Sequence, residues 1–206
     1  MESLPTGISV LDREFDGGIP SGSIVALKAD PASQSELILN RFSRVRECRY
    51  LTTVRSVDAV EEGLALGAAA DETVVRDARG DDPFAVALDA AADLPDCGTV
   101  IVDSVGPLEA GGREEYGAFL DDLRRRVDEA GGLAVLHALK GASAERNRVV
   151  TEQVADVVFD LRTTVTGTEI ANRLIVPKFR GGAALEEPLK LKLTDSVSVD
   201  TSRDIA

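Results

Sequence analysis

Runs of apolar residues recur along the chain, and stretches with helical periodicity separate them. Thr99–Asp103 is apolar up to its closing acid, as expected for a central parallel strand with both faces covered. The other strands expected before residue 140 are Ser23–Lys28, Arg49–Val54, Glu72–Arg76 and Leu133–His137. This alternation of strands and helices predicts an α/β fold with a mainly parallel central sheet flanked by helices.

Amphipathic stretches between these runs predict the helices. In Arg113–Ala130 the apolar residues form one helical stripe, which consists of Tyr116, Phe119, Leu120, Leu123 and Val127. Another helix is expected to begin at Ser33, because Ser33 and Glu36 form the capping box S-x-x-E. Shorter helices are expected over Gly7–Phe15, Val57–Leu66, Asp82–Leu94 and Val149–Ala155.

The C-terminal part of the chain predicts an antiparallel edge to the sheet. Residues 157–163 and 172–181 flank a Thr-Gly-Thr turn and are expected to form an antiparallel pair. Leu189–Asp195 alternates apolar and basic residues and is expected to be the last strand of the sheet. The chain has 206 residues and shows no internal repeat or linker, so one domain over residues 1–206 is expected.

The chain is strongly acidic. It holds 36 Asp and Glu against 23 Lys and Arg, for a net charge of −13, and only five of the basic residues are lysine. This surplus favours a protein from a halophile, because a dense carboxylate surface stays solvated in concentrated salt. An acidic protein that avoids nucleic acid is the plainer alternative. The N-terminus has no apolar signal region and no run reaches the ~20 residues of a membrane span, so a cytoplasmic protein is expected.

The stretch from Ser23 to Phe42 reads as strand, loop and helix, which is the setting of the phosphate-binding loop G-x-x-x-x-G-K-[ST]. On that frame the sequence supplies Ala29, Asp30, Pro31, Ala32, Ser33, Gln34, Ser35 and Glu36. Gln34 stands where a glycine leaves room for phosphates, Ser35 lacks the lysine charge, and Glu36 replaces the hydroxyl that ligates Mg²⁺.

These replacements predict that ATP and Mg²⁺ bind weakly or not at all. A carboxylate and a phosphate oxygen ~4 Å apart repel by about 4 kcal/mol at an effective dielectric near 20, and the lysine that offsets this repulsion is missing. Two alternatives remain for the segment. It is an ordinary strand, turn and helix that never held phosphate, or Glu36 caps the helix.

The residues before this loop form a composite motif. Leu4–Leu27 carries a T-G-I, a Leu-Asp pair, a Gly-Gly-Ile-Pro turn and a Gly-Ser, which are Thr6, Gly7, Ile8, Leu11, Asp12, Gly17, Gly18, Ile19, Pro20, Gly22 and Ser23. This composite resembles the entry segment of KaiC-like and RadA-like members of the RecA superfamily. Gly98–Leu108 is similar to the Walker B strand of that superfamily, and Asn172–Gly182 to its C-terminal K-x-R-G segment. The resemblance spans nearly the whole chain and implies a RecA-like P-loop fold.

The resemblance also implies roles for three residues. Asp103 closes the Walker B strand, where the family's aspartate orders Mg²⁺ through water. Here it would be a relic that forms an acidic pair with Glu36, or an ordinary cap of the next turn. Lys178 and Arg180 match the K-x-R that reaches the γ-phosphate of the neighbouring subunit in KaiC-like hexamers. A basic pair on an edge strand also opposes aggregation, so a structural role stays open.

Other positions lack the chemistry of an ATPase. In KaiC-like ATPases a pair of glutamates primes the attacking water, and the matching positions here are Val54 and Arg55, neither of which is a base. His137 is the only histidine, at a position similar to the ligand sensor of RecA-type folds. The sequence shows no nucleophile or metal ligand beside it.

These losses favour a non-catalytic RecA-superfamily protein, similar to the short KaiC-like and RadA-paralogue proteins of archaea, that acts as a regulatory or assembly partner. Its partner would be a protein, either a second copy or a related RecA-type ATPase, and no catalytic residue, metal or firmly bound cofactor is predicted. One alternative is an active ATPase in which Glu36 and Asp103 both hold the metal. Another is a recombination accessory that contacts DNA or a RadA-type recombinase through loop Ala138–Arg148, although the charge of −13 opposes DNA binding.

Overall fold

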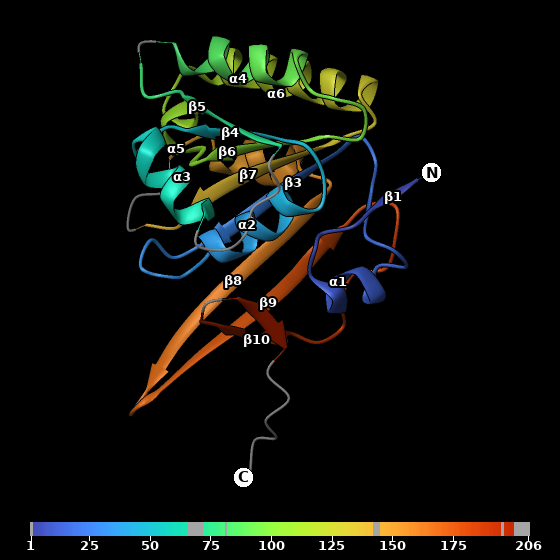
Figure 1. Cartoon of the computed structure of the whole chain (residues 1–206), viewed down its shortest axis with the longest axis vertical. Coiled ribbons are helices and arrows are strands. Elements are labelled where there is room, and N and C mark those ends of the chain that lie inside the picture. The colour runs from blue at the N-terminus through green and yellow to red at the C-terminus, as the bar shows by residue number, and fades with distance from the viewer. Residues whose placement is uncertain (1, 66–71, 81, 142–144, 195, 200–206) are drawn as a thin grey trace.

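A nine-stranded sheet crosses the part of the chain that the computed structural model describes, which is residues 2–65, 72–80, 82–141, 145–194 and 196–199 (Figure 1). Its strands are β3 (Ser23–Ala29), β4 (Cys48–Thr52), β5 (Thr73–Asp77), β6 (Thr99–Asp103), β7 (Leu133–Leu139), β8 (Val157–Thr166), β9 (Glu169–Phe179), β10 (Leu189–Leu193) and β11 (Val197–Val199). Two short strands, β1 (Ser3–Leu4) and β2 (Ile19–Pro20), pair separately.

The strand order is β11-β10-β9-β8-β3-β7-β6-β4-β5. The six strands from β8 to β5 are parallel, whereas β9, β10 and β11 join in antiparallel pairs. The predicted α/β fold with a mainly parallel sheet and an antiparallel C-terminal edge is therefore confirmed. The expectation that Leu189–Asp195 ends the sheet was wrong, because β11 pairs with β10 beyond it. Asp195 itself lies outside the described residues.

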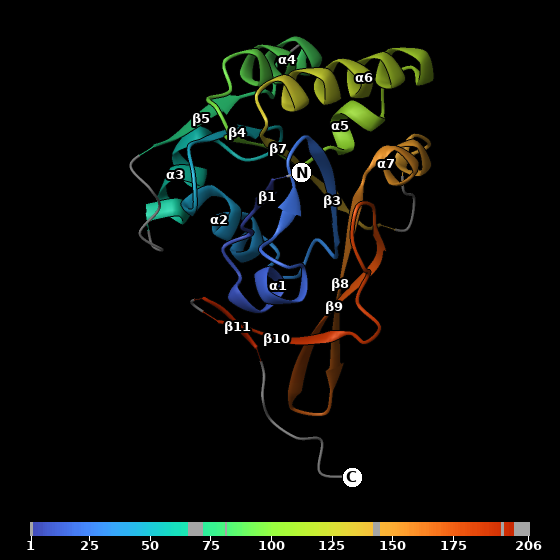
Figure 2. The ribbon, with the colours of Figure 1, turned by 90° about the vertical axis from the view of Figure 1, so that its right-hand side faces the viewer.

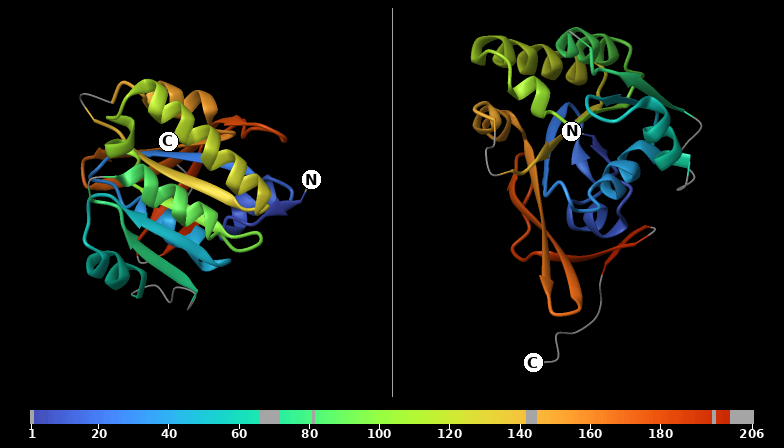
Figure 3. Two further views of the ribbon diagram at one scale, coloured as in Figure 1. Left: turned by 90° about the horizontal axis from the view of Figure 1, so that it is seen from above. Right: turned by 90° about the vertical axis from the view of Figure 1, so that its left-hand side faces the viewer.

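Helices cover both faces of the sheet (Figures 2 and 3). They are α1 (Ser9–Glu14), α2 (Glu36–Arg44), α3 (Val57–Ala65), α4 (Pro83–Ala92), α5 (Gly106–Glu109), α6 (Arg113–Glu129) and α7 (Arg148–Val154). Successive residues of β3 point to opposite faces of the sheet. Ile24 packs in the core formed with α4 and α6, and Val25 packs in the core formed with α1, α2 and α3. The apolar stripe predicted for α6 is buried throughout. Leu66, the last residue of the predicted third helix, lies outside the described residues.

The predicted capping box at the start of α2 was wrong. The helix begins at Glu36, and the hydroxyl of Ser33 instead donates to the carbonyl of Asp30 at 2.6 Å. The N–H of Ser33 donates to the same carbonyl at 2.9 Å. Both donors of Ser33 therefore stabilise a turn from Asp30 to Ser33 within the loop between β3 and α2.

The N-terminal motif has a structural use. The N–H and hydroxyl of Thr6 donate to Asp12 Oδ1 at 2.6 and 2.7 Å, which ties the first segment to α1. Gly18 has a φ of +129°, and a Cβ there would clash with the carbonyl of Leu4, so only glycine fits where β1 meets β2. These motif residues therefore hold the N-terminal segment to the domain.

No helix in the described part of the chain is long and apolar enough to cross a membrane. The two cysteines carry free thiols, and Cys48 is fully buried in the core while Cys97 packs at its margin.

Candidate functional site

The candidate site lies near the carboxyl ends of three neighbouring strands, β6, β7 and β3. In the parallel pair of β6 and β7, Asp103 is the register partner of His137. On the other side of β7, strand β3 pairs Leu27 with His137 and leads into the loop that carries Ser35. Ligands of open α/β sheets bind at this end of the strands.

A chain of hydrogen bonds joins the three side chains. Asp103 Oδ1 lies 2.6 Å from His137 Nδ1, and His137 Nε2 lies 3.0 Å from Ser35 Oγ. All three residues are buried, with exposed fractions of 7%, 4% and 1% for Asp103, His137 and Ser35. The histidine for which the sequence shows no partner therefore has two.

The second oxygen of Asp103 accepts two further hydrogen bonds. Tyr50 donates its hydroxyl and Arg55 donates Nη2, each at 2.7 Å. Burial alone raises the pKa of Asp103, but the hydrogen bonds from His137, Tyr50 and Arg55 outweigh burial and lower this pKa to about 2. Asp103 is therefore a carboxylate at neutral pH.

The negative charge of Asp103 also shifts the pKa values of its neighbours Tyr50 and Arg55. Burial, and then the negative charge of Asp103, raise the pKa of the Tyr50 hydroxyl well above its usual range. Burial lowers the pKa of Arg55, but its hydrogen bond to Asp103 and the charges around it, including that of Glu36, give a net rise. Tyr50 thus remains a neutral donor and Arg55 a cation.

These side chains line a small pocket of about 130 Å³. Its walls are Pro31, Ser35, Glu36, Val54, Arg55, Asp103, Ser104, His137 and Leu139. Pockets that hold drug-sized ligands measure roughly 300–1,000 Å³, so this one suits only a small group.

The residues of the predicted phosphate-binding loop separate into two sets. Pro31, Ser35 and Glu36 line the small pocket, whereas Ala32, Ser33 and Gln34 line a wider groove of about 550 Å³ along β9 and β10. Ala29 closes β3, and its carbonyl accepts the N–H of Lys140 at 2.8 Å. Asp30 accepts both bonds from Ser33 described above.

Gln34, which stands where a glycine would leave room for phosphates, reaches toward the end of β10. In the amide orientation that satisfies its hydrogen bonds, Gln34 donates to the carbonyls of Leu193 and Thr194 at 3.2 and 3.1 Å. The side chain is therefore held by the end of β10.

The expected acidic pair of Glu36 and Asp103 has a cation beside it. Both carboxylates line the small pocket, but Arg55 forms an ion pair of 2.7 Å with Asp103 and is also attracted by Glu36. Sequence reasoning treated Arg55 only as a lost glutamate and missed it as the cation of the site. Its position directly after a central parallel strand was the signal that could have found it.

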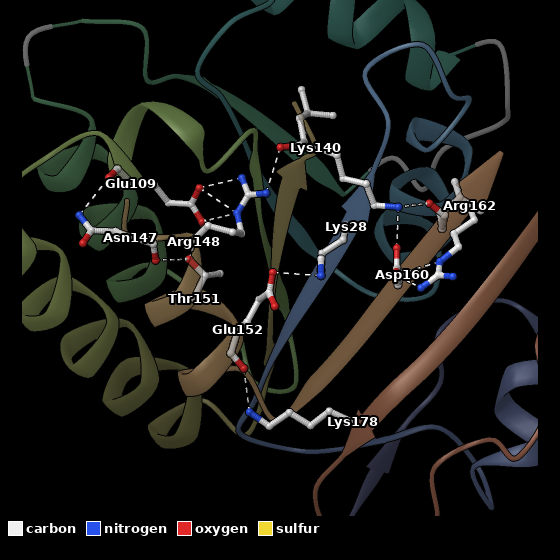
Figure 4. Close-up of polar contacts among 12 residues, drawn as sticks. Lys28, Glu109, Lys140, Asn147, Arg148, Thr151, Glu152, Asp160, Arg162 and Lys178 are labelled. Carbon is white, nitrogen blue, oxygen red and sulfur yellow. Dashed lines mark hydrogen bonds and ion pairs between the residues drawn. The ribbon is translucent and has the colours of Figure 1, made fainter. Parts of the chain in front are cut away.

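Lys178 and Arg180 lie against α7 of the same chain. Lys178 Nζ donates to the carbonyl of Glu152 at 2.8 Å, near the end of that helix (Figure 4). It also donates to the carbonyl of Gln153 at 2.9 Å. Arg180 donates to the carbonyl of Gln153 at 3.0 Å and approaches Asp156 at 3.4 Å. Their contact with a neighbouring subunit stays a prediction.

Basic residues of the predicted DNA-contacting loop pair inside the chain. Lys140 lies 2.5 Å from Asp160, and Arg148 forms a buried, bidentate pair with Glu109 whose shortest distance is 2.7 Å (Figure 4). Residues 142–144 of that loop lie outside the described residues. Among the residues that are described, no group of three or more His, Cys, Asp or Glu is arranged to hold a metal ion.

Comparisons with known proteins agree with this fold. A family model described as "Family of unknown function (DUF7125)" matches residues 3–206. The crystal structure of a KaiC-like protein from the hyperthermophilic archaeon Pyrococcus horikoshii OT3 superposes with a TM-score of 0.78 at 15% identity, over 97% of this chain and 99% of that one. No curated protein matches the sequence. At this identity the likeness concerns the fold alone, which is KaiC-like.

Proposed function

This chain belongs to the family of unknown function DUF7125, and we propose that it is a KaiC-like protein that does not turn over nucleoside triphosphates and acts instead as a regulatory or assembly partner of another protein. The partner would be a second copy of this chain or a related RecA-type ATPase. The degenerate phosphate-binding loop at Ala29–Glu36 is part of this proposal, with Asp103 as a retained position of the former nucleotide site.

One observation carries the proposal. At the carboxyl end of the sheet, Asp103, His137, Ser35 and Arg55 bind one another around a pocket of about 130 Å³. These side chains, including the cation Arg55, make their hydrogen bonds and ion pair with one another, which supports a pocket that does not hold a triphosphate. Since removal of one positioned electrostatic group typically costs ~10² to 10³ in rate, the joint loss of lysine, glycines and metal-binding hydroxyl supports the absence of turnover.

A phosphate-release assay with ATP and Mg²⁺ tests this proposal. The assay is run in molar KCl because of the net charge of −13, and the expected rate equals that of a blank without protein. The Glu36→Ala variant is the matched control, since it removes the like charge without restoring the lysine, and it is also expected to stay at blank. Release well above blank by the unaltered chain would contradict the proposal.

Arg55 favours one competing function, an ATPase with an unconventional site, because it brings a cation into the pocket. Its ion pair with Asp103 neutralises that charge, so titration calorimetry with a non-hydrolysable ATP analogue is expected to give no heat of binding. Micromolar binding that Arg55→Ala abolishes would support the competing function instead. Light scattering of the chain alone, and with a RecA-type ATPase from the same source, then tests the assembly role.

A further inference from the structure

Ser35, His137 and Asp103 are arranged as a nucleophile, a base and a group that orients the base. The two links measure 3.0 and 2.6 Å and use the two different nitrogens of the imidazole. Such a constellation is recognised by geometry and roles rather than by sequence position.

The hydrogen bond to Asp103 determines which nitrogen of the His137 ring carries a proton. Asp103 has a pKa of about 2 and so accepts but cannot donate at neutral pH. His137 Nδ1 must therefore carry the proton of their shared bond. Whenever the imidazole is neutral, this tautomer leaves Nε2 as an acceptor, 3.0 Å from the Ser35 hydroxyl that can donate to it. This is the direction that prepares the hydroxyl to attack.

We propose that Ser35 is the nucleophile of a hydrolytic site for short acyl esters, with His137 as its general base and Asp103 as the positioning residue. The limit to short acyl groups follows from the pocket, whose volume of about 130 Å³ leaves room for an acyl group of a few heavy atoms. Arg55 lines the pocket, and its side chain is 38% exposed. This site does not depend on the assembly role proposed above.

The reaction at this site takes place in two steps. Ser35 Oγ attacks the acyl carbon while His137 Nε2 takes the hydroxyl proton, and the ester C–O bond breaks as the alcohol leaves with that proton. Water then attacks the acyl-serine, gives its proton to His137, and Ser35 recovers a proton as the carboxylic acid is released. The acyl oxygen gains negative charge in the first step. Of the groups that line the pocket, Arg55, which is also paired with Asp103, and the N-terminus of α2 favour that charge, whereas Glu36 opposes it.

Covalent labelling of the folded chain with a fluorophosphonate probe, followed by peptide mass spectrometry, tests the proposal. The expected result is a single adduct on Ser35 that disappears in Ser35→Ala and forms at least ~10²-fold more slowly in His137→Gln. Ser9→Ala is the matched control, because Ser9 is an exposed serine on α1, and labelling is expected to be unchanged. p-Nitrophenyl acetate is expected to be hydrolysed in the same pattern, and the decanoate ester is not.

A second variant guards against misfolding of His137→Gln. In Ser35→Cys the His137 base is kept, and the introduced thiol is expected to react with iodoacetamide at least ~10-fold faster at pH 7 than a small-molecule thiol of ordinary pKa. No adduct on Ser35 in the unaltered chain, or labelling that is independent of His137 in a folded variant, would overturn the proposal. Such a result leaves the phosphate-release test of nucleotide turnover and the light-scattering test of the assembly role unaffected.

Discussion

Asp103 and His137 are register partners in the parallel strands β6 and β7, and their side chains meet at 2.6 Å at the end of the sheet. Parallel pairing fixes this contact, since register partners on adjacent strands present their side chains on the same face of the sheet. Asp103 also accepts from Tyr50 on the other neighbouring strand, β4, and from Arg55 just beyond it. One buried carboxylate thus joins three consecutive strands.

The first prediction concerns the pH dependence of stability. Against the competing effect of burial, the donors His137, Tyr50 and Arg55 lower the folded-state pKa of Asp103 from 3.8 to about 2. A lowered pKa means that the stabilisation is present above the unfolded pKa and is lost as the pH falls through about 4 toward 2. Relative to Asp103→Asn, this contribution is expected to be about 2 kcal/mol at neutral pH.

Urea unfolding at a series of pH values measures this contribution. The difference in the free energy of unfolding between the unaltered chain and Asp103→Asn is expected to shrink as the pH falls below 4. Glu36→Gln serves as the control, because Glu36 lines the same pocket and is placed outside the hydrogen bonds to Asp103. A difference that stays constant from pH 7 to pH 3 would show that Asp103 acts through packing rather than charge.

Much of the sheet was predictable because apolar runs fix strands locally. Thr99–Asp103 was predicted with the bounds that β6 has, and Arg113–Ala130 differs from α6 by one residue at its end. β11 was missed because Val197–Val199 is only three residues long, too short for any periodicity. The strand exists through its pairing with β10, which is a tertiary contact.

The site was harder to predict because it depends on register and on side-chain direction. Asp103 and His137 were both recognised at strand ends, but their contact follows only once β6 and β7 are known to be neighbours. The bond from Ser35 to His137 spans 102 positions, and local pattern gives no information on it. The capping box failed for a local reason, since Ser33 donates to Asp30 and closes the turn before the helix begins.

The second prediction concerns the buried ion pair of Glu109 and Arg148, whose side chains are 0% and 8% exposed. Arg148 donates to both carboxylate oxygens of Glu109, and Thr151 donates to one of them. Glu109→Ala leaves the guanidinium buried without its partner, so the free energy of unfolding is expected to fall by about 3–5 kcal/mol. Guanidinium chloride unfolding measures this loss.

Two further variants distinguish the cost of leaving the Arg148 charge buried and unpaired from a general loss of stability caused by substitution. Asp122→Ala breaks an exposed pair, in which Asp122 and Arg125 lie 2.6 Å apart, and is expected to cost less than about 1 kcal/mol. The double variant Glu109→Met with Arg148→Met removes both charges and is expected to be more stable than Glu109→Ala alone. If the double variant loses more stability than the single one, desolvation of an unpaired charge is not the cause.

The last prediction concerns Lys178, whose ammonium donates to the carbonyls of Glu152 and Gln153 at 2.8 and 2.9 Å. These carbonyls belong to the last turn of α7, where cations are favoured by the helix dipole. Lys178→Ala is therefore expected to lower the free energy of unfolding by about 1 kcal/mol and to leave the molar mass in solution unchanged.

Urea unfolding and light scattering of the same samples check both parts of this expectation. Lys192→Ala on β10 is the matched control, since it removes an equal charge from an exposed site, and a change within about 0.5 kcal/mol is expected. The contrary result, a smaller molar mass for Lys178→Ala with unaltered stability of the monomer, would mean that the ammonium serves a neighbouring subunit. The carbonyls of α7 would then be only its resting partners in the isolated chain.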